Sequence, residues 1–119
     1  MNYTIHITGS AKRDINEAAD YVEYTLLNPK AADNLINLIE NAINQLAFMP
    51  EKYSLVNDPV LSSWGIRMIV INNYLAFYTV DKKAKAVYIV RFLYGKRNWI
   101  SILSKDMVNV DWTVEIHKS

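Results

Sequence analysis

Residues 66–94 read IRMIVINNYLAFYTVDKKAKAVYIVRFLY, and this stretch decides the fold. Three runs within it alternate with period two and are rich in β-branched and aromatic residues, which predicts three strands: 66–71, 74–80 and 86–93. Asn72-Asn73 is a two-residue link, and Asn tolerates the positive φ that tight hairpins need. Residues 81–85 supply a longer hairpin loop. The stretch therefore predicts three consecutive antiparallel strands.

The segment before it predicts a strand and a first helix. Residues 3–7 alternate in the same way and predict the first strand. Ser10 is the expected N-cap of the helix that follows, whose apolar residues recur at helical spacing as far as Leu26. Acidic residues are expected on the outer face of this helix: Asp14, Glu17, Asp20 and Glu23.

A second helix is predicted from Asn28-Pro29, a capping Asn followed by Pro at the first helical position. It should end near Phe48, because Pro50 disfavours helix at the residue before it. Residues 51–63 form a polar connection with little periodicity. The chain is therefore predicted to be an α+β protein, a helical hairpin packed on an antiparallel sheet in the order β-α-α-β-β-β.

The C-terminal part predicts a short helix over residues 96–103. We place one domain at residues 1–103 and a C-terminal extension at 104–119. Residues 112–116 alternate and are either an added strand or an unstructured end. A chain of 119 residues is long enough to form one hydrophobic core.

Composition excludes several classes of protein. The chain has no cysteine, so it has no disulfide framework and no thiolate metal site. It shows no signal peptide and no apolar run of about 20 residues, the length of a membrane helix. We therefore expect a cytoplasmic protein with no membrane contact, no metal and no cofactor.

The net charge of +1 hides an uneven distribution. Residues 1–62 hold four Lys/Arg and eight Asp/Glu, whereas residues 63–105 hold eight Lys/Arg and one acid, Asp81. A basic segment of this kind favours an anionic partner, either nucleic acid or an acidic protein segment. The lysines of the 82–85 turn are interpreted as solvated charge only.

The hairpin loops set an expected register that places Arg67, Tyr78 and Tyr88 side by side, with Val80 opposite Ala86. One face then carries an aliphatic set that the helices should cover: Ile66, Met68, Val70, Leu75, Phe77, Val87, Ile89 and Leu93. The other face is expected to be open, aromatic and basic: Arg67, Tyr78, Tyr88, Phe92 and Tyr94.

An open face of this kind suits RNA. The Arg67 guanidinium can hold a phosphate, and tyrosines such as Tyr78 and Tyr88 can stack on unpaired bases. The alternative for the two tyrosines has equal weight, namely that cross-strand aromatic pairs only stabilise the sheet. For Arg67 we favour catalysis or partner binding, since an arginine between β-branched neighbours adds little packing.

A family resemblance rests on four segments in a fixed order: Ala11-Lys12-Arg13-Asp14-Ile15 with Asp20-Tyr21-Val22, then Ile43-Asn44-Gln45-Leu46-Ala47-Phe48-Met49-Pro50, then Ile66-Arg67-Met68-Ile69-Val70 with Asn73-Tyr74-Leu75-Ala76-Phe77-Tyr78, and finally Val87-Tyr88-Ile89-Val90-Arg91-Phe92-Leu93-Tyr94-Gly95-Lys96-Arg97. Over roughly residues 3–103, the chain resembles RelE/ParE-type toxins of type II toxin–antitoxin systems, also called plasmid-stabilisation proteins. The predicted element order agrees with the fold that this resemblance implies.

The resemblance implies two different activities. RelE-like toxins are mRNA interferases that cut messenger RNA on the ribosome without metal, and ParE-like toxins poison DNA gyrase without nuclease activity. For a nuclease, the resemblance assigns phosphate binding to Arg67 and Arg97 and proton transfer to Tyr94. Arg91 and Lys96 match further basic positions, and Tyr78 and Tyr88 are the expected partner- or RNA-binding tyrosines.

Three hypotheses follow, with the ribosome-dependent nuclease placed first. The second is a gyrase inhibitor, and the third is a degenerate toxin that only binds its antitoxin. The chain has Leu93-Tyr94 where many family members have a histidine, and it lacks the lysine-rich segment of the RelE nucleases. All three hypotheses imply a cognate antitoxin whose acidic, apolar segment lies across the helices or the sheet face. A homodimer or a toxin–antitoxin heterotetramer stays open.

Overall fold

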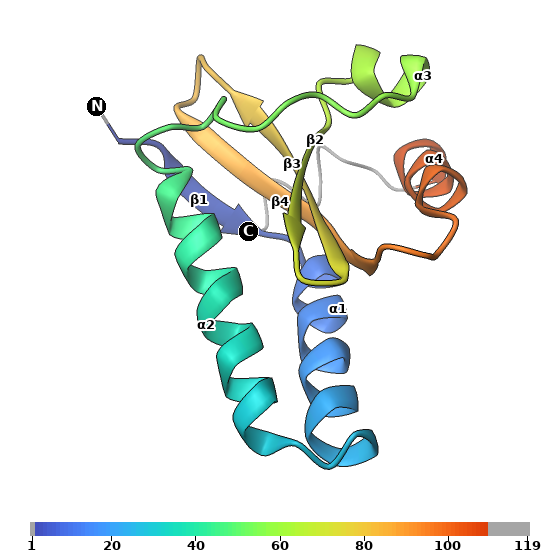
Figure 1. The fold of residues 1–119 in the computed structure, drawn as a ribbon. Coiled ribbons are helices and arrows are strands. Elements are labelled where there is room, and N and C mark those ends of the chain that lie inside the picture. The colour runs from blue at the N-terminus through green and yellow to red at the C-terminus, as the bar shows by residue number, and fades with distance from the viewer. Residues whose placement is uncertain (1, 110–119) are drawn as a thin grey trace.

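The computed structural model describes residues 2–109 and shows one twisted sheet with helices on both of its faces (Figure 1). Its elements are β1 (Thr4–Ile7), α1 (Gly9–Asp20), the π-helix η1 (Tyr21–Thr25), α2 (Pro29–Gln45), α3 (Pro59–Ser63), β2 (Arg67–Ile71), β3 (Tyr74–Asp81), β4 (Ala86–Tyr94) and α4 (Trp99–Asn109). The predicted order β-α-α-β-β-β with a short C-terminal helix is confirmed.

The sheet has the strand order β1-β4-β3-β2. Strands β2, β3 and β4 form the expected antiparallel meander, and β1 joins its β4 edge as a parallel strand. The tight turn at Asn72-Asn73 is confirmed, because Ile71 pairs with Tyr74 and Asn72 has a φ of 52°. The first hairpin therefore has the register that its turn predicts.

The second hairpin differs from the expected register by one residue. Val80 pairs with Val87, not with Ala86, and a β-bulge lies between Phe77 and Tyr78. The turn is one residue shorter than expected, because Asp81 pairs with Ala86, and this places residues 86–89 on the other face of the sheet. The unpaired residue of the bulge is Val90 of β4, and beyond it Phe92 and Leu93 lie on their expected faces again. A pattern of alternating residues does not reveal such an insertion.

Helices cover both faces of the sheet, which overturns the expectation of one open face. The helical hairpin of α1 and α2 covers the face of Tyr78 and Phe92 that was expected to be open, and Val87 and Ile89, expected on the aliphatic face, lie there too. Helices α3 and α4 cover the opposite face, which carries Ile66, Phe77, Val90 and Leu93. Tyr78 and Phe92 are buried, and Val70, expected in the core, is 65% exposed. Within residues 2–109, the sheet consequently has no open aromatic face.

The helix starts are set by side-chain caps. Thr8, not Ser10, caps α1: its hydroxyl accepts from the Ala11 N–H at 3.2 Å and donates to the Val90 carbonyl at 3.1 Å. Asn28 caps α2 as predicted. One cap thus joins the first helix to β4, which makes Thr8 the better choice in the folded chain.

Helix α3 was not predicted, and the first helix ends in a form that was not expected. The connection 51–63 contains α3, which has a capping Asp58 and Pro59 at its first position, the same signal that marked α2. The first helix continues past α1 as the π-helix η1, and Leu27 then turns the chain with a φ of 53°. Helix α3 is too short to show a clear period, whereas residues 21–25 lie within the predicted first helix and only their π-helical form was not expected.

Helix α4 closes the second face of the sheet. The Trp99 ring lies 5.2 Å from the Phe77 ring, and Leu103 is buried. The helix spans the boundary that we placed at 103/104, and the strand proposed at 112–116 lies outside the described residues. No helix in residues 2–109 is long and apolar enough to cross a membrane.

One ion-pair network joins three elements. The Arg91 guanidinium of β4 donates to both carboxylate oxygens of Asp14 on α1, at 2.6 and 3.0 Å, and to Asp106 on α4 at 2.7 Å. The Phe92 N–H also donates to Asp14. Asp14 was expected on the outer face of its helix, but its carboxylate is largely buried against β4.

We expect Asp14→Ala to lower the free energy of unfolding by about 3 kcal/mol, because it leaves a mostly buried arginine and a backbone N–H without their partner. Asp106→Ala should cost about 1 kcal/mol, since it removes a single bond at a more exposed position. Urea denaturation of each variant measures both values. Glu17→Ala, an exposed acid on the same helix, is the control and should change stability by less than about 0.5 kcal/mol.

Candidate functional site

Arg67, at the start of β2, is held by the chain itself. Its guanidinium donates to the Tyr53 carbonyl at 2.6 Å and to the Glu51 carboxylate at 3.2 Å. Its side chain is only 18% exposed. Two of the donor groups that would bind a phosphate are therefore occupied by the segment that connects α2 to α3.

Tyr78 lies opposite Arg67 and holds the same segment. Its ring is fully buried, and its hydroxyl donates to the Pro50 carbonyl at 2.9 Å. Burial raises the pKa of this hydroxyl above its ordinary value of 10.0, although nearby Arg67 acts in the opposite direction. Tyr78 is thus a structural residue whose ring is not available to stack on a base.

Arg91 and Tyr88 also have internal partners. Hydrogen bonds from the Arg91 guanidinium to Asp14 raise the arginine pKa further, so its charge is permanent. The Tyr88 ring stacks on His6 of β1, with centroids 5.1 Å apart. The Arg91 guanidinium and the Tyr88 ring therefore both make contacts within the chain.

Tyr94 and Arg97 lie together at the other end of the sheet. Tyr94 is the last residue of β4 and is 40% exposed, and Arg97 follows in a turn closed by a bond from its N–H to the Tyr94 carbonyl. They line a shallow pocket of about 150 Å³ together with Asp14 and Glu17. Lys96 is exposed in the same turn. This corner is the place where two predicted catalytic residues meet.

The structure separates Arg67 from that corner. Arg67 pairs with Tyr78 and Tyr94 pairs with Tyr74, four residues further along β3. Four residues of strand correspond to about 13 Å, and β3 also lies between the strands that carry Arg67 and Tyr94. The three predicted catalytic residues therefore do not converge on one phosphate.

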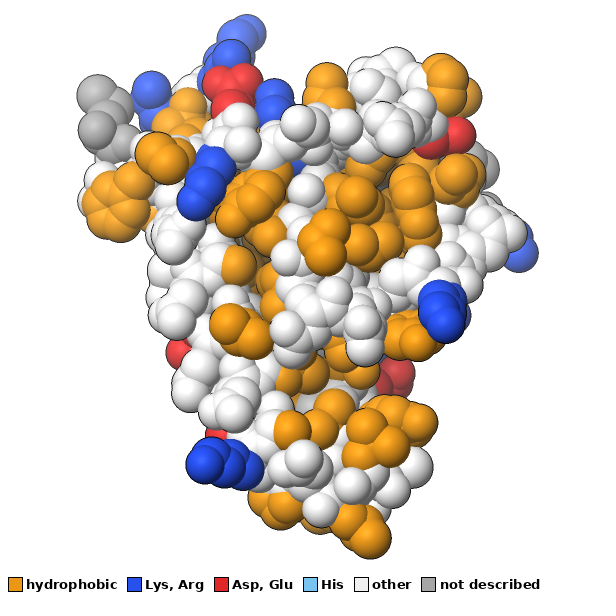
Figure 2. All heavy atoms as spheres, in the orientation of Figure 1, with side chains coloured by type: hydrophobic (Ala, Val, Ile, Leu, Met, Phe, Trp, Pro, Cys, Tyr) orange, Lys and Arg blue, Asp and Glu red, His pale blue; other side chains and the backbone are white. Residues whose placement is uncertain are grey.

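An apolar groove that the sequence did not reveal adjoins the Tyr94 corner. It has a volume of about 600 Å³ and lies between the helical hairpin tip and the β2–β3 turn. Its lining combines aromatic, aliphatic and amide side chains: Tyr21, Val22, Leu26, Ala31, Leu35, Asn72, Asn73, Tyr74 and Tyr94. Figure 2 shows hydrophobic side chains gathered at this tip, where Tyr21 and Leu26 are more than half exposed.

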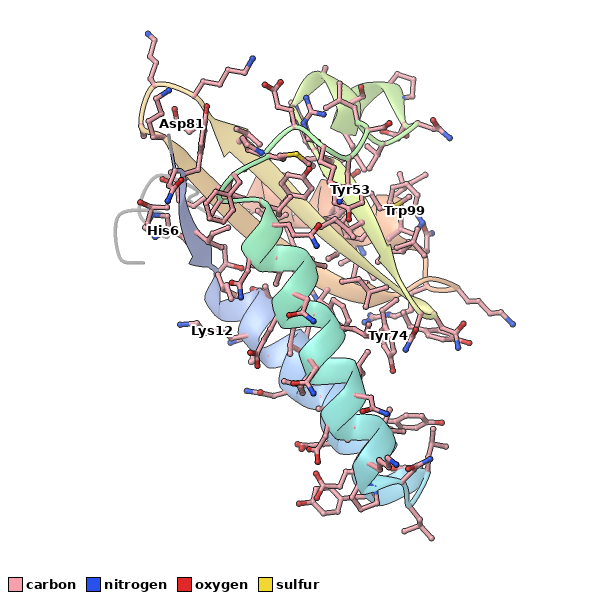
Figure 3. The ribbon with its side chains drawn as sticks, turned by 60° about the vertical axis from the view of Figure 1, so that its left-hand side comes forward. His6, Lys12, Tyr53, Tyr74, Asp81 and Trp99 are labelled. Atoms are coloured by element: carbon pink, nitrogen blue, oxygen red, sulfur yellow. The ribbon has the colours of Figure 1, made fainter. Side chains whose placement is uncertain are left out.

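These groove residues come from three distant parts of the chain. The π-helix turns Tyr21 and Leu26 toward β3, and Tyr74 marks the groove end of β3 in Figure 3. In the sequence, Tyr21 and Leu26 resemble ordinary members of a helical stripe. Only the packing of the tip against the turn makes them a surface, which is why sequence reasoning missed them.

No metal centre is formed in the part of the chain that the structure describes. In residues 2–109, no three His, Cys, Asp or Glu side chains gather to hold an ion. The acids that line the Tyr94 corner, Asp14 and Glu17, lie on one helix, and Asp14 is engaged with Arg91. The site therefore offers hydrogen bonding, aromatic surface and the guanidinium of Arg97.

Comparison with known proteins gives one family and two solved folds. The sequence model of ParE toxins of type II toxin–antitoxin systems (parDE) matches residues 5–99. A chromosomal ParDE system from P. aeruginosa matches with a TM-score of 0.62 and 18% identity, covering 77% of this chain and 95% of that one. The RelBE2 toxin–antitoxin complex from Mycobacterium tuberculosis matches with a TM-score of 0.55 and 20% identity, covering 79% and 99%. No curated protein matches.

We expect Tyr78→Phe to weaken the fold by about 1 kcal/mol at neutral pH, because the Pro50 carbonyl loses its donor. Since the folded pKa is raised, Tyr78 contributes stability that is present below pH 10 and is lost as the pH rises above it. The variant should therefore lose less stability between neutral and alkaline pH. Denaturant titrations at both pH values measure this, with Tyr21→Phe, an exposed tyrosine, as control. An equal alkaline loss in both proteins would contradict the role of Tyr78.

Proposed function

Since this chain belongs to the ParE toxins of type II toxin–antitoxin systems, we propose that it arrests growth by binding DNA gyrase and that a cognate antitoxin neutralises it. In this proposal the toxin has no chemistry of its own. It acts by binding, and the DNA breaks are made by the trapped gyrase itself. The proposal replaces the mRNA nuclease that we placed first from the sequence.

The observation that supports binding over catalysis is the internal occupation of the strand arginines. Arg67 is held by Glu51 and Tyr53, and Arg91 is held by Asp14 and Asp106. Cleavage of RNA through its 2′-OH needs free cations placed around one phosphate, because negative charge builds up there in the transition state. Freeing Arg91 would expose two uncompensated carboxylates and destabilise the fold.

A role for Tyr94 in proton transfer is also poorly supported. RNA cleavage at Tyr94 would need cations around the phosphate, because negative charge builds up there in the transition state. Around Tyr94, the pocket supplies Arg97 together with the carboxylates of Asp14 and Glu17. Carboxylates repel a phosphate and offset the charge of Arg97.

Messenger-RNA cleavage stays the second candidate because of one observation. Tyr94 and Arg97 share a pocket, are accessible, and stand at the positions that the RelE resemblance assigns to proton transfer and phosphate binding. On the ribosome, RNA could draw on these two residues with Lys96 beside them. In that case Arg67 would contribute only to stability.

The apolar groove suits an antitoxin segment. An amphipathic helix or extended segment buries apolar side chains in such a groove, and the exposed Arg97 and Lys96 beside it would pair with acidic residues. The two solved neighbours belong to toxin–antitoxin systems, which supports a partner of this class. Docking there would cover the Tyr94 corner and neutralise its charge.

We expect the purified chain to trap gyrase on plasmid DNA. In a reaction with gyrase, ATP and supercoiled plasmid, detergent and protease should release linear DNA. A cell-free translation reaction with the same chain should leave messenger RNA intact, as judged by mapping of RNA ends. Codon-positioned cuts without linear plasmid would instead establish the nuclease. Absence of both effects, with antitoxin still bound, would leave a degenerate toxin.

The Tyr94→Phe variant separates the two candidates further. It removes only the hydroxyl and keeps the ring that lines the groove, so a binding toxin should retain growth arrest to within about twofold. A nuclease that depends on proton transfer by this hydroxyl should lose about 100-fold or more of its activity. Tyr24→Phe is the matched control, since it makes the same change at an exposed tyrosine that lines neither the groove nor the Tyr94 corner. Loss of arrest in Tyr94→Phe alone would contradict the binding proposal.

A further inference from the structure

Four lysines gather at the end of the sheet opposite the Tyr94 corner. Lys82, Lys83 and Lys85 lie in the β3–β4 turn, and Lys52 follows α2. All four are exposed. Figure 2 shows Lys and Arg side chains around an acidic group at the end where Figure 1 places this turn. We call these four lysines the basic end.

Two polar contacts tie the turn that carries three of these lysines to neighbouring segments. The Lys82 amine pairs with Glu51 at 3.1 Å, which ties the turn to the segment after α2. The Thr4 N–H donates to the Lys85 carbonyl at 2.9 Å, which ties the turn to β1. The lysines that sequence reasoning treated as an isolated solvated turn are therefore joined by a fourth from a distant segment.

The local carboxylates do not cancel this charge. The four lysines outnumber the two carboxylates at this end, Glu51 and Asp81, and Glu51 is shared between Lys82 and Arg67. Within the described residues, no ion pair is formed by Lys52, Lys83 or Lys85. The Lys52 amine donates to the neutral Gln45 amide oxygen at 2.8 Å, which leaves its charge uncompensated. The charges of these three amines are consequently available to an external anion.

Tyr3 and Tyr53 lie at this end, and the lysines beside them favour double-stranded over single-stranded nucleic acid. The Lys85 amine lies 5.3 Å from the centre of the Tyr3 ring, and the Lys52 amine lies 5.4 Å from the centre of the Tyr53 ring. Single strands bind by stacking bases on open aromatic faces. Here a lysine covers one face of each ring, so the surface presents amines in place of stacking platforms.

From this arrangement we infer that the basic end binds the phosphate backbone of duplex DNA, independently of sequence. Lysine amines are compact charges that contact phosphates without reading bases. This inference goes beyond gyrase binding, because it gives the chain its own contact with DNA. It does not depend on gyrase being the target, and it is tested without gyrase.

The test measures binding of a fluorescent 20-base-pair duplex to the purified chain by anisotropy, in a series of salt concentrations. We expect a Kd of about 10⁻⁶–10⁻⁴ M, the range of non-specific binding. The variant Lys52→Gln/Lys83→Gln/Lys85→Gln should weaken binding at least tenfold. The slope of log K against log salt should fall in magnitude by about 0.9 for each phosphate that the variant no longer neutralises. Residue 85 has a positive φ of 54°, and Gln at this position is no more strained than Lys.

The matched control is Lys12→Gln/Lys30→Gln/Lys105→Gln, which removes the same charge from exposed lysines elsewhere. It should change the Kd by less than twofold, and thermal unfolding should show that both variants are folded. Equal loss in both variants would mean only general charge attraction and would overturn the inference. It would equally be overturned if the duplex did not bind at low salt, or if single-stranded RNA or poly-glutamate bound more tightly than the duplex.

Discussion

The contact of Arg91 with Asp14 and Asp106 is the interaction on which the layers of this molecule depend. It joins α1, β4 and α4 through one guanidinium, and the same Asp14 carboxylate receives the Phe92 N–H. Removing charges from water is costly, and only paired geometry with further hydrogen bonds offsets that cost. Arginine suits this position because its planar group reaches two carboxylates and stays charged. An arginine that holds the fold in this way is not free to bind a ligand.

Because helices are fastened to both faces, function is confined to the ends and edges of the sheet. The helical hairpin covers one face, and α3 and α4 cover the other. What remains accessible is chemically divided: an apolar, aromatic groove with Arg97 at one end, and the lysines of the basic end at the other. In Figure 3, Tyr74 and Asp81 mark these two ends of β3. One rigid strand thus holds apart two surfaces suited to different partners.

Local sequence signals predicted the helices and strands, whereas long-range contacts determine which residues are accessible at the candidate site. The strands, the Asn72-Asn73 turn and the Asn28-Pro29 helix start depend on neighbouring residues, and all appear in the structure. The start of β4 was assigned to the wrong face because the turn before it is one residue shorter than expected, and the bulge at Val90 then restores the expected alternation. The roles of Arg67 and Arg91 were invisible for another reason. Their partners Glu51 and Asp14 lie 16 and 77 residues away, and no spacing rule connects them.

The net charge of +1 says little about partners, because the strand arginines are paired inside the chain and the lysines lie at the surface. Arg67 and Arg91 are bonded inside the chain, where a fork of donors can satisfy carbonyl and carboxylate groups together. Lysine amines, strongly hydrated and flexible, stay at the surface. In residues 2–109, the exposed cations outside these pairs include Lys52, Lys83, Lys85, Arg97 and Arg13, and the exposed acids include Glu17 and Glu23 on the helical hairpin. Attraction to an anion is therefore governed by where unpaired lysines gather, because exposed charges further apart than about 8–10 Å are screened at physiological salt.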